Sequence, residues 1–136
     1  AALNLPYIAM HMQGRPQTMQ IQPQYTNVVK EIIDYFIQKI TAIGQAGIKD
    51  VIIDPGFGFG KTIAQNYQLL TALHHFSILD KPILAGLSRK SMIYKVLGNT
   101  PEEALNATTA LNMLALQNGA DELAERLVPK LVSQNY

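Results

Sequence analysis

The sequence predicts an α/β fold built from parallel strands, each followed by a loop and a helix. Three observations predict this class. Short apolar runs recur along the chain and are continuous rather than alternating, as in strands covered on both faces. A polar or glycine-rich loop follows each run and leads into a segment with helical spacing of apolar residues. No linker or low-complexity segment divides the chain, so we expect a single domain over residues 1–136.

The first unit begins with a strand predicted over Pro6–His11, which is followed by a polar loop. A long amphipathic helix is predicted over Tyr25–Ala46, because its apolar residues keep helical spacing. Thr26 or Asn27 is placed to cap this helix, and Gly47 ends it.

The remaining elements repeat the same order. We predict a strand at Asp50–Ile53, a helix at Ile63–Phe76, a strand at Ile83–Leu87, a short helix between Ser88 and Gly98, and a helix at Pro101–Asn118. Thr100 is the expected N-cap of the last of these helices, with Pro101 at its first position. A final helical pattern covers Asp121–Val132.

Composition excludes several classes of function. The 136 residues carry a formal net charge of +1, which gives no electrostatic case for nucleic acid or an anionic membrane. Cysteine is absent, which excludes disulfides and thiolate metal sites and fits the cytoplasm, where we expect the protein. The N-terminus has no signal-peptide pattern, and no apolar run reaches membrane-spanning length.

The strongest indication of a functional site is Asp54–Lys61, with the sequence Asp-Pro-Gly-Phe-Gly-Phe-Gly-Lys. Asp54 ends a predicted strand, and three glycines let the following backbone turn sharply. Folds of this class place ligands at the carboxyl ends of their strands. The alternative is an ordinary strand-to-helix turn, but Phe57 and Phe59 are costly to bury together in so tight a turn. The glycine spacing fits neither Walker A nor the dinucleotide-binding pattern, so we exclude both.

A second candidate site is Ser88–Ser91, with the sequence Ser-Arg-Lys-Ser. At a helix start, free N–H groups, hydroxyls and two cations favour a carboxylate or a phosphate. The alternative is a solvated cap with a routine basic pair, but Lys90 would follow a strand beside that of Asp54. His11 ends the first strand and is interpreted as structural, while Met10 is placed to line a pocket floor. No His, Asp or Glu set has metal-ligand spacing.

Three motifs together resemble dihydropteroate synthase. They are Met10–Gly14, Asp54–Lys61 and Gly86–Met92, which come in that family's order over residues 1–120. The resemblance implies half of a (β/α)8 TIM barrel, with three parallel strands and flanking helices. It also implies a transferase of folate biosynthesis, which joins hydroxymethyl-dihydropterin diphosphate to p-aminobenzoate and releases diphosphate.

The resemblance assigns roles to residues at the motif positions. Asp54 and Lys90 would be the catalytic residues, with Asp54 accepting hydrogen bonds from the pterin and Lys90 contacting its oxygen and ring nitrogen. The substrate-binding residues would be Met10, Gly58, Phe59, Arg89, Ser91 and Lys61. Of these, Ser91 would hold the aminobenzoate carboxylate, and Lys61 is either a ligand contact or a structural residue. Sulfonamides mimic p-aminobenzoate in this family, so the same half-site would be their target.

The chain departs from the family pattern in two ways that bear on catalysis. The first half of the barrel is missing, with its asparagine for magnesium and diphosphate, so Mg2+ would enter only with the substrate diphosphate. After Ala120 the family continues into an eighth strand with Arg-Val-His-Asp, where this chain shows its final helical pattern. We therefore expect little turnover by the chain alone. The alternative is a catalytically inactive half-barrel that acts as an assembly or folding unit and keeps a residual half-site.

Open strand edges and exposed strand faces predict a homodimer or a higher oligomer. The faces that should fill the interior of a barrel are expected to come from Ile8, Met10, Val51, Ile53, Ile83 and Ala85.

Overall fold

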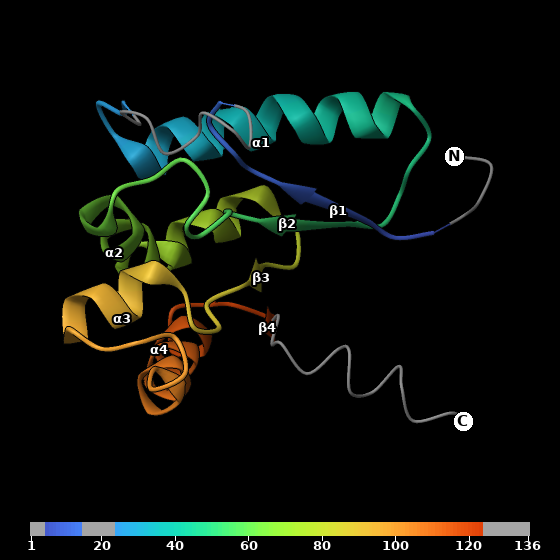
Figure 1. Cartoon of the computed structure of the whole chain (residues 1–136). Helices are drawn as coiled ribbons and strands as arrows, with labels where there is room; N and C mark the ends of the chain where they lie inside the picture. Colours follow the sequence, from blue (N-terminus) through green and yellow to red (C-terminus); the bar gives the residue numbers. More distant parts are fainter. Residues whose placement is uncertain (1–4, 15–23, 124–136) are drawn as a thin grey trace, which may run out of the picture.

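The computed structural model describes residues 5–14 and 24–123, and their elements follow the expected order (Figure 1). The strands are β1 (Tyr7–Met10), β2 (Val51–Asp54), β3 (Leu84–Ala85) and β4 (Glu122–Leu123). The helices are α1 (Val28–Gln45), α2 (Ile63–Thr71), α3 (Ser91–Leu97) and α4 (Leu105–Gln117), with the 3-10 helix η1 (Leu73–Leu79) after α2. Within these described ranges, no helix is both long enough and apolar enough to cross a membrane.

The four strands run parallel in the order β1-β2-β3-β4. β1 pairs with β2, which places Met10 opposite Asp54, and β3 pairs with β4. A bridge between Ile53 and Ile83 joins the two pairs, and the Ile53 N–H donates to the Pro82 carbonyl at 2.9 Å. Because the strands share one direction, the loops that follow β1, β2 and β3 lie at the same edge of the sheet, where the carboxyl ends of the strands meet (Figure 1).

The core lies between one face of the strands and the helices. Ala9, Ile53 and Ala85, one from each of the first three strands, are at most 2% exposed. Large apolar side chains of the helices fill the same layer, namely Ile32, Phe36, Leu69, Leu70, Leu73, Phe76 and Met92.

The opposite face of the strands is open. Ile8 and Met10 are 52% and 37% exposed, and the strand register places them beside Ile52 and Asp54. The predicted open face is therefore right for Ile8 and Met10, but it is wrong for four residues that are buried beneath the helices: Val51, Ile53, Ile83 and Ala85. A continuous apolar strand does not reveal which of its alternating side chains meets the helices, since the register of the neighbouring strand decides this.

The caps explain where the helices begin. Asn27 is the N-cap of α1, because its Oδ1 accepts a hydrogen bond from the Lys30 N–H at 3.0 Å, which confirms one of the two expected caps. The helix predicted over Ile63–Phe76 divides into α2 and η1, and α2 begins with a capping box formed by Thr62 and Gln65.

The helix predicted over Pro101–Asn118 begins later than expected. Residues 101–104 form turns, and α4 starts at Leu105 after Ala104. Thr100 does not cap α4; its N–H and hydroxyl donate to Glu103 Oε2 at 3.0 and 3.2 Å, which closes a local turn instead.

Strand β4 takes the place of the start of the helix predicted over Asp121–Val132. The N–H groups of Asp121 and Glu122 donate to the Ile83 carbonyl at 2.9 and 3.0 Å, and Asp121 Oδ2 accepts from the Ile83 N–H at 2.9 Å. The helix prediction is therefore wrong for residues 121–123, and the count of three strands becomes four. Pairing along the edge of β3 outweighs the local helical pattern here. The rest of the predicted helix lies outside the described residues.

Candidate functional site

We define the glycine loop as residues 54–61, which begin at the last residue of β2. The loops that follow β1 and β3 both pack against it. Gly56 and Gly58 have φ angles of 73° and 80°, which side chains other than glycine rarely adopt. A Cβ added to Gly56 would lie 1.9 Å from the His11 carbonyl oxygen, and one added to Gly58 would lie 3.1 Å from Lys90 Cδ. Glycine at these two positions therefore lets the other two loops pack directly against the glycine loop.

Asp54 ends β2, and its register with Met10 places it on the open face. Its Oδ1 accepts a hydrogen bond from the Gly56 N–H at 2.8 Å, and no other described residue donates a hydrogen bond to this carboxylate. Burial raises the pKa of the Asp54 carboxyl, while the Gly56 N–H and the cations of Lys90 and Lys61 act in the opposite direction. Asp54 is thus a partly buried carboxylate with one oxygen available to a ligand.

Lys90 reaches across to the glycine loop. Its Nζ donates a hydrogen bond to the Phe57 carbonyl and lies 4.4 Å from the centroid of the Phe59 ring, within cation–π range. Burial lowers the pKa of Lys90, and Asp54 opposes that shift. The expected opposition of charges is therefore present, but it is not a direct ion pair, because the one ion pair among the described residues lies within α1.

Lys61 is the last residue of the glycine loop and is only 3% exposed. Its Nζ donates to the carbonyls of Gly56 and Phe59 at 2.8 and 3.0 Å and lies 3.2 Å from His11 Nδ1. Three partners occupy the three N–H groups of an ammonium. Burial lowers the pKa of Lys61 to about 7, and burial together with Lys61 lowers the pKa of His11 to about 4, so His11 is neutral. This geometry supports the structural role of Lys61 over ligand contact, and it supports a structural His11.

The third loop places Lys90 through a left-handed turn at Arg89, whose φ is 51°. The Arg89 N–H donates to Oγ1 of Thr108 in α4 at 3.0 Å, and α3 then begins at Ser91. Arg89, Lys90 and Ser91 are all partly exposed, and Lys90 contacts the glycine loop. Their roles in ligand binding stay predictions.

Sequence reasoning missed two buried residues that hold these loops, Asn66 and Thr108, each 2% exposed. Asn66 lies in α2, and its Oδ1 accepts from the Gly58 N–H at 2.8 Å. Both residues lie in helices outside the three motifs. The signal that indicates them is a polar residue at a core position of a helix, such as Asn66 in register with Leu69 and Leu70.

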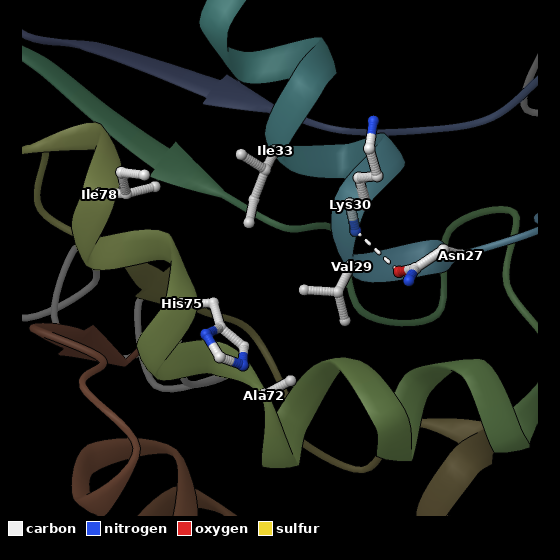
Figure 2. A pocket seen from close by; sticks show the side chains of 7 residues that line it. All are labelled: Asn27, Val29, Lys30, Ile33, Ala72, His75 and Ile78. Carbon is white, nitrogen blue, oxygen red and sulfur yellow. Dashed lines mark hydrogen bonds between the residues drawn. The ribbon is translucent and has the colours of Figure 1, made fainter.

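A surface pocket of about 470 Å3 lies elsewhere, between α1 and the segment around η1 (Figure 2). Its lining comes from Asn27, Val29, Lys30, Ile33, Ala72, His75 and Ile78. None of these residues belongs to the three loops, and the hydrogen bond drawn in Figure 2 is the N-cap of α1. The pocket therefore adds nothing to the site around Asp54.

Comparison with known proteins gives matches over most of the chain. The chain matches the family model of pterin binding enzymes over residues 1–124. It is 45% identical to the dihydropteroate synthase of Escherichia coli K12 over 122 residues, which are 88% of this chain and 43% of that protein.

Two solved structures share the fold. The dihydropteroate synthase of Stenotrophomonas maltophilia, with imidazole bound in its active site, is 42% identical with a TM-score of 0.87, over 90% of this chain and 47% of that one. The Yersinia pestis enzyme in complex with a sulfonamide drug is 38% identical with a TM-score of 0.88, over 90% of this chain and 46% of that one. The chain thus spans less than half the length of each of these relatives. Its parallel strands and covering helices form part of the TIM barrel of those enzymes, and the chain belongs to the family of pterin binding enzymes.

Proposed function

We propose that this chain carries the half of a dihydropteroate synthase active site that binds the pterin and p-aminobenzoate. The reaction joins hydroxymethyl-dihydropterin diphosphate to p-aminobenzoate and releases diphosphate. The observation that carries the proposal is Asp54, a partly buried carboxylate with an available oxygen, beside Met10 and the cation of Lys90. Membership of the family, and relatives that are dihydropteroate synthases, support it.

In this proposal the two charged residues bind opposite kinds of atoms on the pterin. The amino-pyrimidine edge donates hydrogen bonds to Asp54. Lys90 uses one N–H group on the Phe57 carbonyl, and its other two N–H groups are directed to the oxygen and ring nitrogen of the pterin. Met10 and Phe59, which flank these residues, pack against the rings of the substrates.

Ser91 and Arg89 are assigned to the carboxylate of p-aminobenzoate. Ser91 is the first residue of α3, and both side chains are partly exposed next to Lys90. The Yersinia pestis relative binds a sulfonamide drug, which supports the same half-site as the target of sulfonamides in this chain.

The chemistry asks for positioning and charge stabilisation rather than for a covalent nucleophile. As diphosphate departs, the methylene carbon gains cationic character, and the amine of p-aminobenzoate attacks it. Over residues 5–14 and 24–123, no group of three or more His, Asp or Glu side chains is placed to hold a metal ion. Magnesium carried by the substrate diphosphate and a cytoplasmic location stay predictions.

We also propose that the chain associates with itself. Ile8 and Met10 are exposed on the open face, and burying apolar surface contributes about 25 cal/mol per Å2. Pairing through a two-fold axis is the commonest way to cover such a face. Light scattering after size-exclusion chromatography measures the mass directly, and a monomer over a wide range of concentrations would contradict this part of the proposal.

Titration with the pterin diphosphate tests the site. Asp54→Asn keeps the shape of the side chain and removes its charge, so we expect affinity to fall about tenfold or more, as when a charged hydrogen bond is lost. Asp80→Asn is the matched control, because Asp80 is exposed at the end of η1 and lies outside the three loops. Asn tolerates the left-handed backbone of residue 80, whose φ is 49°. If Asp54→Asn binds as tightly as the parent, the assignment is wrong.

Product formation separates the enzyme from its alternative. Dihydropteroate made from the two substrates with magnesium supports a catalytic chain. Pterin binding without product supports the inactive half-barrel with a residual half-site. A chain that neither binds nor turns over the pterin contradicts the proposed function.

A further inference from the structure

The peptide group between Phe57 and Gly58 is held from both sides by side chains that lie outside the glycine loop. Its carbonyl accepts a hydrogen bond from Lys90 Nζ. Its N–H donates to Asn66 Oδ1 at 2.8 Å. Two hydrogen bonds at opposite ends of one amide polarise it in the same direction, so each strengthens the other.

Asn66 is itself tightly fixed. It is 2% exposed, and its Nδ2 donates to the Thr62 carbonyl at 2.8 Å and to the Lys61 carbonyl at 3.4 Å. These two carbonyls accept only, so the amide nitrogen of Asn66 must face them and its oxygen must face Gly58. The start of α2 is held in turn by the capping box of Thr62 and Gln65.

Gly58 makes this arrangement sensitive to small movements. Its φ is 80°, and the aliphatic stem of Lys90 packs against its Cα. A Cβ added to Gly58 would lie 3.1 Å from Lys90 Cδ. The Lys90 ammonium then lies between the Phe57 carbonyl and the Phe59 ring. A rotation of the 57–58 peptide would therefore move the acceptor and the packing surface of Lys90 together.

We propose that Asn66 is a positioning residue for Lys90: by holding the peptide between Phe57 and Gly58, it fixes the carbonyl that orients the lysine ammonium. Asn66 is buried, and the hydrogen bonds that connect it to Lys90 run through that peptide. The consequence for ligand binding rests on the proposed function, in which Lys90 contacts the pterin. Without Asn66, the peptide loses the hydrogen bond from the Gly58 N–H to Asn66 Oδ1, and the Phe57 carbonyl then orients Lys90 less well.

A double-mutant cycle with the pterin diphosphate tests whether Asn66 acts on ligand binding through Lys90. Asn66→Ala is expected to weaken pterin binding about tenfold in the parent chain and to have no further effect when Lys90 is already replaced by alanine. Leu69→Ala is the control for lost stability, because Leu69 is also fully buried in α2 but makes no hydrogen bond to the glycine loop. Equal effects of Asn66→Ala in both backgrounds, or an effect no larger than that of Leu69→Ala, overturn the proposal.

A ligand-free measurement separates this proposal from the proposed function. In lysine labelled with 13C, the Lys90 Cε resonance, assigned by its loss in Lys90→Met, is expected to move in Asn66→Ala and to stay in place in Leu69→Ala. If the Lys90 Cε resonance does not move in Asn66→Ala, the proposed positioning role of Asn66 is wrong. If the parent chain binds no pterin, the proposed function fails while this readout still decides the role of Asn66.

A reverse measurement needs no variant of Asn66. In Lys90→Met, the carbonyl of the 57–58 peptide loses its cation, so the Gly58 N–H becomes a weaker donor to Asn66. We expect the Gly58 amide proton to shift to lower frequency in this variant. An unchanged Gly58 amide would show that the two hydrogen bonds are not coupled, and would overturn the proposal even if Asn66→Ala did not fold.

Discussion

Replacing Gly56 with alanine is expected to push β1 away from the glycine loop. The added Cβ would lie 1.9 Å from the His11 carbonyl oxygen and 3.0 Å from its carbon. Contacts to a Cβ below 3.0 Å essentially never occur, so the backbone of the two loops must separate by at least about 1 Å. The crowded atoms belong to main chain on both sides, and no side-chain rotation relieves them.

The loss in free energy of unfolding follows from the hydrogen bonds that such a separation breaks. Two hydrogen bonds cross the gap that would open: the His11 N–H donates to the Asp54 carbonyl at 2.9 Å, and Lys61 Nζ lies 3.2 Å from His11 Nδ1. Each of these hydrogen bonds contributes about 1 kcal/mol. The left-handed φ of 73° at Gly56 costs alanine about 1 kcal/mol more. We therefore expect Gly56→Ala to lower the free energy of unfolding by about 3 kcal/mol.

Two other glycines provide matched controls. Gly98 caps α3 with a φ of 67°, and nothing lies within 4 Å of an added Cβ. Gly98→Ala should therefore lower the free energy of unfolding by only about 1 kcal/mol, the cost of the left-handed backbone for alanine. Gly44 lies inside α1 with equally open space, so Gly44→Ala should stabilise the chain by about 0.5–1 kcal/mol.

Urea unfolding followed by circular dichroism measures all three variants on one scale. The expected order of stability is Gly44→Ala, then the parent, Gly98→Ala and finally Gly56→Ala. If Gly56→Ala is no less stable than Gly98→Ala, the close approach of the His11 carbonyl does not control the loop, and the reasoning is refuted.

Two further predictions concern acid stability and the division of the ligand site. Because the pKa of His11 is lowered from 6.5 to about 4, the unfolded chain takes up this proton first, and the parent should lose up to about 3 kcal/mol as pH falls from 6.5 to 4. In His11→Gln, the free energy of unfolding measured with urea should fall by about 3 kcal/mol less over the same pH range. If it falls as much as in the parent, the prediction is wrong. Lys90→Ala should weaken pterin binding, whereas Ser91→Ala should mainly weaken binding of p-aminobenzoate or a sulfonamide. Calorimetric titrations that find both ligands weakened alike by both substitutions would show that the division is wrong.

Local signals in the sequence determined the order of the elements and gave a predicted place for the site. Helical spacing and the cap at Asn27 predicted α1, and apolar runs predicted the first three strands close to where they lie. Asp54 and Lys90 were predicted as site residues because short motifs mark the carboxyl ends of strands, and parallel strands bring those ends to one edge of a sheet. These signals depend on neighbours within a few residues, so they can be read without knowing the fold.

Contacts between distant segments were decided only by the tertiary structure. The face that Val51 and Ile53 present depends on the register with β1, and residues 121–123 became a strand because the backbone of Ile83 offered them hydrogen bonds. The three partners of Lys61 Nζ, which are two carbonyls of the glycine loop and the ring of His11 after β1, likewise come together only in the folded chain. Asn66 carried no motif at all, since its partner Gly58 is a backbone group in another segment. Pairing and burial of such groups depend on the whole chain, and the local pattern around each residue does not contain them.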